Sequence, residues 1–116
     1  MNDATPANSS LTITNIYGAL DHLPVDADKT INATPLHKTP GMHILLIALD
    51  AQAELKRHTA PGPISVQVIK GSISFRTDNA LHDLSVGELL TLEANIPHSV
   101  YAHESSAFLV TKNIHT

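Results

Sequence analysis

Residues 55–71 read LKRHTAPGPISVQVIKG, and residues 86–100 read VGELLTLEANIPHSV. In both stretches apolar and polar residues alternate, which is the pattern of a strand with one buried face. Each stretch carries one histidine, His58 or His98, and a glycine at an expected turn. Two such stretches with a short spacer between them indicate an all-β fold built from short strands.

The rest of the chain adds further short strands. The pattern predicts strands over residues 11–16, 42–49, 54–58, 64–69, 72–76, 81–86, 88–92, 99–102 and 107–111. The strand over 42–49 is apolar at nearly every position, so we expect both of its faces to be covered. Residues 16–23 favour a helical turn stopped by Pro24. Two prolines in residues 29–40 exclude a helix there and limit any strand to a sheet edge.

The chain of 116 residues is long enough for one domain with a real core. We expect residues 31–116 to form a single β-barrel domain and residues 1–30 to form an N-terminal extension. Residues 1–10 hold nothing that could be buried, so we expect them to be disordered. The hydrophobic content of 42% is that of a globular protein.

Composition excludes several function classes. The formal charge of −4 without a lysine or arginine cluster argues against nucleic acid as a partner, and the lack of tryptophan argues against a stacking platform for single strands. The absence of cysteine excludes disulfides, a thiolate nucleophile and cysteine-ligated zinc. No apolar run is long enough to span a bilayer, and the polar start is unlike a secretory signal, so we expect a cytoplasmic protein without membrane contact.

Residues 41–111 resemble a small single-domain cupin of the RmlC-like kind. The stretch over 55–71 resembles the first cupin motif, in which a histidine at a strand end precedes a bend and a strand that ends in a glycine turn. The stretch over 86–100 resembles the second, in which a glycine and an acidic residue precede an apolar strand and a proline-containing turn delivers a histidine. The resemblance implies an all-β, cupin-type jelly-roll barrel with very little helix.

The resemblance also bears on metal binding. Metal-binding cupins usually supply two histidines and a carboxylate from the first motif and one histidine from the second. Here His98 matches the second-motif histidine and His58 matches one first-motif histidine, but the carboxylate position falls on or near Ile64 and the first motif contains no Asp or Glu. A divalent transition metal (Fe, Mn, Ni or Zn) on His58 and His98 would need an additional ligand such as His43; otherwise no cofactor is implied.

Two functions of different classes follow. The first is a small-molecule-binding cupin without a complete metal site, in which His58 and His98 are polar groups at the mouth of an apolar pocket. We expect this pocket to be lined by Ile64, Val66, Val68, Leu90, Leu92 and Val100. The second is a metal-dependent cupin enzyme, an oxygenase or isomerase, that uses His58 and His98 plus an extra ligand. The sequence leaves open whether the protein is an enzyme.

Arg57 is either an outward strand residue or an anchor for an anionic ligand at the barrel mouth. Ser99 and His98 are adjacent on one strand and point to opposite faces, so they form no triad with Asp83. Small cupins commonly pair as homodimers, and the strand expected over 11–16 could add to a partner's sheet.

Overall fold

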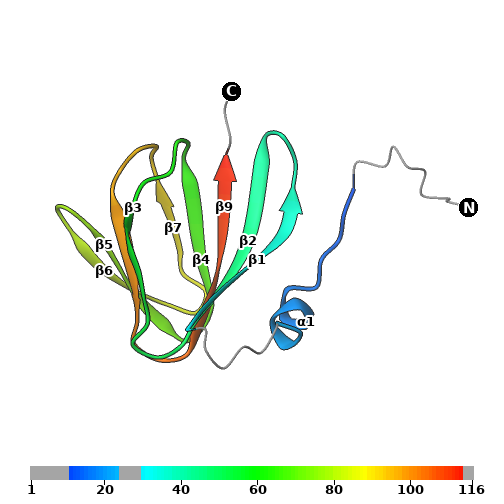
Figure 1. The fold of residues 1–116 in the computed structure, drawn as a ribbon, viewed down its shortest axis with the longest axis horizontal. Helices are drawn as coiled ribbons and strands as arrows, with labels where there is room; N and C mark the ends of the chain where they lie inside the picture. Colours follow the sequence, from blue (N-terminus) through cyan, green and yellow to red (C-terminus); the bar gives the residue numbers. More distant parts are fainter. Residues whose placement is uncertain (1–10, 24–29, 114–116) are drawn as a thin grey trace, which may run out of the picture.

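The computed structural model of the chain describes residues 11–23 and 30–113. In chain order its elements are α1 (Ile16–Asp21), β1 (Ile31–Lys38), β2 (Met42–Leu49), β3 (Glu54–His58), β4 (Ile64–Lys70), β5 (Ser72–Thr77), β6 (Leu81–Ser85), β7 (Leu89–Leu92), β8 (His98–Ala102) and β9 (Ser106–Asn113). Figure 1 shows the strands as two layers that converge at one end of the molecule and diverge at the end where β9 finishes.

The strands form two antiparallel sheets. The five-stranded sheet has the order β1-β2-β9-β4-β7, and the four-stranded sheet has the order β3-β8-β5-β6. Strands that are neighbours in a sheet are mostly distant in the sequence, because most connections between consecutive strands cross from one sheet to the other. This is the jelly-roll arrangement that the sequence predicts, and the all-β prediction is confirmed.

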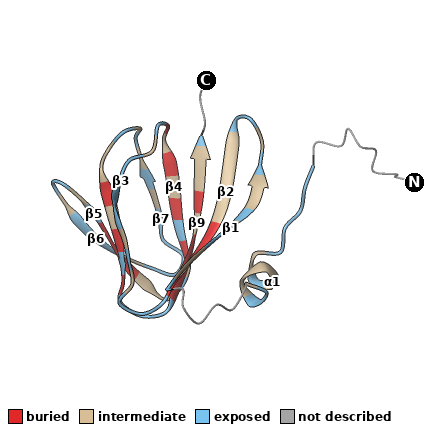
Figure 2. Ribbon diagram, in the orientation of Figure 1, coloured by how far each residue is buried: buried red, intermediate tan, exposed pale blue. Residues whose placement is uncertain are grey.

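The core fills the space between the two sheets. Alternation along each strand points every second residue inward, so Val66 and Val68 of β4 meet Ile73 and Phe75 of β5, all at most 1% exposed. Phe108 of β9 joins the same cluster. In Figure 2 buried residues occur in both layers, and they belong to the inner strands of the two sheets, not to the edge strands β1, β3, β6 and β7.

Strand β2 is covered on both faces, as its apolar run predicts. Ile47 and Leu49 face the core between the sheets. Leu46 has the opposite parity and lies outside the core cluster, yet it is fully buried. None of the eight residues of β2 is exposed.

Strand β1 is an edge strand, as the prolines of residues 29–40 predict, and one of these, Pro35, lies within it. It pairs with β2 alone, and the register of that pairing shifts between Pro35 and His37. Pro35 has no backbone N–H to donate, so an edge position with a shifted register is where a strand tolerates it.

The strand predicted over residues 11–16 is wrong. Residues 11–15 have no regular structure, and the side chains of Leu11 and Ile13 are 70% and 88% exposed. Asn15 ends this segment by capping α1: its side-chain oxygen accepts the backbone N–H of Gly18 at 2.9 Å. The helical turn predicted over residues 16–23 is confirmed, whereas Pro24 and residues 1–10 lie outside the described residues. Within the described ranges no helix is long and apolar enough to cross a membrane.

Candidate functional site

Two histidines meet at the open end of the jelly roll. His58 is the last residue of β3 and His98 is the first residue of β8, and the two are directly paired across these antiparallel strands. Their ring centroids lie 4.3 Å apart with the ring planes tilted by 60°. Two residues that are 40 positions apart in the sequence therefore form one imidazole pair, to which we refer as the histidine pair.

An irregularity in β3 turns His58 toward the inside. Leu55 pairs with Val100, and the next registered pair is His58 with His98, so three steps along β3 match two steps along β8. In a regular strand residues three apart point to opposite faces. The extra residue brings Leu55 and His58 to the same inner face, which is the effect of a β-bulge.

Both imidazoles are oriented by a backbone carbonyl two residues earlier. Nδ1 of His58 lies 2.6 Å from the carbonyl oxygen of Lys56, and Nδ1 of His98 lies 2.9 Å from that of Ile96. A carbonyl oxygen only accepts, so each Nδ1 carries the proton and donates it. In the neutral rings Nε2 therefore keeps its lone pair, free to accept a hydrogen bond or to bind a metal.

The surroundings of His98 keep it neutral. Its side chain is only 4% exposed, and its ring stacks on Phe75 with centroids 5.2 Å apart and an angle of 12° between the planes. Burial lowers the pKa of His98, the Ile96 carbonyl opposes this, and the charge that a protonated His58 would carry and the charge of Lys112 lower the pKa further. His98 is thus an uncharged acceptor at neutral pH.

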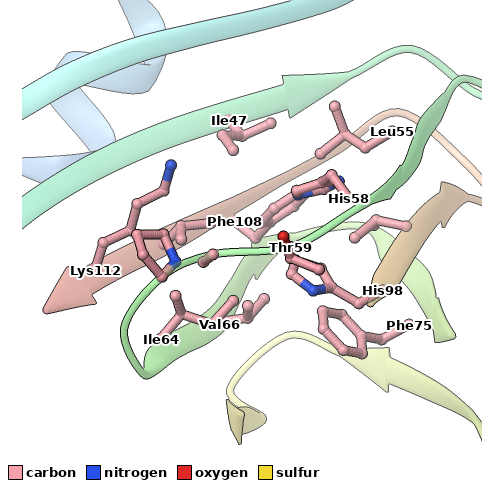
Figure 3. Close-up of a pocket in the computed structure, with 14 residues that line it drawn as sticks. Ile47, Leu55, His58, Thr59, Ile64, Val66, Phe75, His98, Phe108 and Lys112 are labelled. Atoms are coloured by element: carbon pink, nitrogen blue, oxygen red, sulfur yellow. The ribbon is translucent and has the colours of Figure 1, made fainter. Parts of the chain in front are cut away.

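The histidine pair borders a cavity of about 110 Å³ between the two sheets. Apolar side chains from both sheets form most of its wall, among them Ile47, Val66, Phe75 and Phe108. Figure 3 shows His58 and His98 on one side of this cavity and Lys112 on the other. Thr59, in the loop that follows β3, adds a hydroxyl at the exposed mouth. We refer to this cavity as the barrel pocket.

Three of the six pocket residues predicted from the sequence line the barrel pocket, namely Ile64, Val66 and Val100. Val68 is not in its wall; it lies further along β4, in the core, and is 1% exposed. Leu90 and Leu92 pair with Val66 and Ile64, but their strand β7 is the edge of its sheet.

Leu90 and Leu92 line a second hollow instead, together with Phe75 and His82. The sequence predicted correctly that both side chains point inward, since both pack against the core cluster. It could not show that an edge strand lies beyond the wall of the pocket, because strand order depends on long-range pairing.

The predicted metal ligands are only partly brought together. His43 has the inward parity of β2 and pairs with Lys112 of β9, but it is not in the wall of the barrel pocket. On its other side Lys112 pairs with Ile64 of β4. A lysine therefore lies between His43 and Ile64, the position at which metal-binding cupins carry a carboxylate. Within residues 11–23 and 30–113 no three His, Asp or Glu side chains are grouped so that they could hold a metal ion.

Among the wall residues that the sequence did not predict, Lys112 is the charged one. The alternation Phe108, Val110, Lys112 would have placed it on the inner face, but the strand was predicted to end at residue 111, whereas β9 continues to Asn113. Arg57, by contrast, points away from the pocket. Its side chain is 63% exposed and forms a two-contact ion pair with Asp78, at 2.9 and 3.1 Å.

A serine, an aspartate and a histidine do meet, but on the outer face of the four-stranded sheet. Ser74 Oγ lies 2.5 Å from Asp83 Oδ1 and 2.5 Å from His103 Nε2. The serine hydroxyl donates to the carboxylate, so its oxygen accepts from the imidazole, and the imidazole is not placed to take the serine proton as it does in a catalytic triad. Ser99 lies by a hollow on this outer face while His98 is inside, which confirms that Ser99, His98 and Asp83 form no triad.

Comparison with known proteins identifies the fold. No protein-family model matches the sequence, and no curated protein matches it either. Solved structures do match, with 80–90% of this chain covered in the three examples that follow. A cupin superfamily protein from Desulfitobacterium hafniense has a TM-score of 0.74 and 14% identity, and 84% of its chain is covered.

A conserved protein of unknown function from Streptococcus pyogenes has a TM-score of 0.75 and 21% identity, with 89% of its chain covered. An RmlC-like cupin from Methanocaldococcus jannaschii, with a double-stranded β-helix fold, has a TM-score of 0.68, 18% identity and 89% of its chain covered. The chain therefore has the fold of a small cupin domain. The fold does not by itself assign a ligand or a reaction.

Proposed function

We propose that the protein binds a small organic molecule in the barrel pocket and does so without a complete cupin metal site. The observation that carries this proposal is the cavity of about 110 Å³ whose apolar wall is interrupted by His58, His98, Thr59 and Lys112. Apolar walls with a few convergent polar groups are typical of ligand sites. The apolar part of the ligand would lie between the sheets, and its polar part would reach the histidine pair.

A fragment screen tests this proposal. Small organic acids, alcohols and amides are screened against the full chain by ligand-observed NMR, with Thr59→Phe as the variant, because Thr59 lies at the exposed mouth of the pocket. The matched control is Thr12→Phe, at an exposed position in the N-terminal segment. Fragments that bind the wild type and Thr12→Phe but not Thr59→Phe support the proposal. Absence of any binder, or equal binding to both variants, overturns it.

A second candidate function is that of a metal-dependent cupin enzyme, an oxygenase or isomerase. It is favoured by one specific observation: both Nδ1 atoms are held by backbone carbonyls, which leaves Nε2 of His58 and His98 as a pair of potential ligands. Fe, Mn, Ni or Zn would act there as a Lewis acid or oxygen binder, with further ligands from substrate or water.

Metal content distinguishes the two candidates. Untagged wild-type protein and the His58→Ala/His98→Ala double variant are compared by plasma mass spectrometry. Near-stoichiometric metal in the wild type that is lost in a folded double variant supports the enzyme. Wild-type protein that stays metal-free after incubation with each of the four metals excludes it.

A further inference from the structure

Lys112 gives the barrel pocket a positive charge, and among the residues that the structure describes no Asp or Glu lines the pocket wall beside it. It lies on the inner face of β9, in cross-strand register with His43 on one side and Ile64 on the other. Its side chain is only partly exposed and lines the pocket wall opposite the histidine pair (Figure 3). The titratable residues of the wall are His58, His98 and Lys112, and the wall contains no Asp or Glu.

Arg57 differs from Lys112 because it has a counter-charge. Arg57 is paired with Asp78 in two contacts, outside the pocket. Lys112 takes part in neither of the ion pairs found in the described part of the chain. A partly buried ammonium without a counter-charge is costly for the empty protein and becomes favourable when an anion binds beside it. The charge of Lys112 acts on His98 across the pocket. It lowers the pKa of His98, although less than burial and the electrostatic effect of His58 do.

The histidine pair, on the opposite wall of the pocket, requires a hydrogen-bond donor from the ligand. With each Nδ1 donating to a carbonyl, Nε2 of His58 and Nε2 of His98 present acceptors to a ligand when the rings are in their neutral form. A carboxylate has only acceptors, so it would meet two lone pairs at the histidine pair and one ammonium at Lys112. A hydroxyl or amine, by contrast, can donate to Nε2.

We propose that the ligand is a short organic acid with two polar ends, a carboxylate that pairs with Lys112 and a hydroxyl or amine that donates to the histidine pair, joined by a branched apolar segment. This inference rests on the proposed binding function and names the class of its ligand. The apolar segment would contact the apolar wall of the pocket, which includes Val66, Phe75 and Phe108.

Three probes of nearly equal shape separate the two polar requirements. They are β-hydroxyisovalerate, isovalerate, which lacks the hydroxyl, and β-hydroxyisovaleramide, which lacks the charge. Their dissociation constants are measured by titration calorimetry with the full chain, with Lys112→Met, which keeps most of the lysine stem, and with Lys70→Met. Lys70 is an exposed lysine outside the barrel pocket and serves as the matched control.

We expect β-hydroxyisovalerate to bind about ten- to hundredfold more tightly than its amide, the range that a hydrogen bond to a charged group contributes. We expect isovalerate to be weaker by about threefold to tenfold, the value of one neutral hydrogen bond. Lys112→Met should abolish the preference for acid over amide and keep the preference for the hydroxyl. Lys70→Met should change neither preference.

The outcomes separate this inference from the proposed function. If acid and amide bind the wild type equally, or if Lys112→Met keeps the preference for the acid, the ligand class is wrong while the binding pocket stands. If none of the three probes binds but other fragments occupy the pocket, the ligand class is again wrong. If neither the probes nor the fragment library bind, both proposals are overturned.

Discussion

His58 and His98 are directly paired across β3 and β8, with ring centroids 4.3 Å apart. The pairing depends on the extra residue in β3, which turns His58 to the inner face that His98 already occupies. Each ring is then held by the backbone carbonyl two residues earlier, that of Lys56 in β3 or that of Ile96 in the turn before β8. The site is therefore organised by backbone geometry, and its chemistry can be changed one side chain at a time.

The stability of the protein should depend on pH through His98. Burial lowers the pKa of His98 in the folded protein, whereas an unfolded histidine titrates near ~6.5. Below that pH the unfolded chain binds more protons than the folded one, so the free energy of unfolding falls as the pH decreases. The stability that neutral His98 contributes is fully present above pH ~6.5, the pKa of the unfolded histidine. It is lost as the pH falls through the lowered pKa of the folded protein.

This is measured by urea unfolding between neutral and mildly acid pH. His98→Gln should unfold with a smaller pH dependence than the wild type over this interval. His82→Gln, which changes an exposed histidine, should keep the wild-type dependence. Identical pH profiles for the wild type and His98→Gln would contradict the account of the buried imidazole.

Phe75 supports both the core and the histidine pair. It is 1% exposed and stacks on the ring of His98. Phe75→Ala should therefore lower the free energy of unfolding by about 3–5 kcal/mol, the usual cost of emptying an aromatic core position. Leu81→Ala, at a side chain that is 54% exposed, is the control and should cost far less. Equal losses in chemical denaturation would place Phe75 outside the rigid core.

Two glycines with positive φ provide a matched pair of variants. Gly71 and Gly87 have φ values of 76° and 91°. A Cβ at Gly71 would overlap the side chain of Ser106, whereas a Cβ at Gly87 meets nothing. Gly87→Ala should cost about 1–2 kcal/mol from backbone strain alone. Gly71→Ala should cost clearly more in the same denaturation experiment; equal costs would contradict the tight approach of Ser106 to this turn.

We propose that the protein is a homodimer in solution. The N-terminal segment carries three exposed apolar side chains, Leu11, Ile13 and Tyr17, at 70%, 88% and 60% exposure. A second copy is a simple source of cover for such side chains. Light scattering of the full chain should give twice the monomer mass, and Leu11→Ser/Ile13→Ser should shift it toward the monomer. A monomeric wild type at all concentrations would remove the dimer.

Local patterns predicted most of the fold. Alternation located most of the strands from residue 54 onward, because each buries one side against the core, a continuous apolar run located β2, and Pro35 marked β1 as an edge strand. The same alternation failed over residues 11–16. There Asn15 caps α1, and the segment belongs to neither of the two described sheets. Alternation is necessary for a half-buried strand, but a strand also needs a partner, and partners are set by the whole chain.

The site was less predictable for the same reason. His58 and His98 were found through the resemblance to cupins, but their contact depends on a bulge that no local pattern marks. Lys112 had the right parity and was overlooked because the last strand was predicted two residues too short. Leu90 and Leu92 had the right parity too, yet strand order placed them by another hollow.

The central claim, that the barrel pocket is a binding site, is tested most directly by methyl NMR of the full chain. The methyl resonances of Ile64, Val66 and Val110, in the wall of the pocket, are followed while the fragment set is added. If the pocket is a binding site, fragments that bind should shift these resonances and leave those of the exposed Leu81 unchanged. Fragments that shift Leu81 and spare the pocket methyls, or a fragment set that shifts none of them, would contradict it.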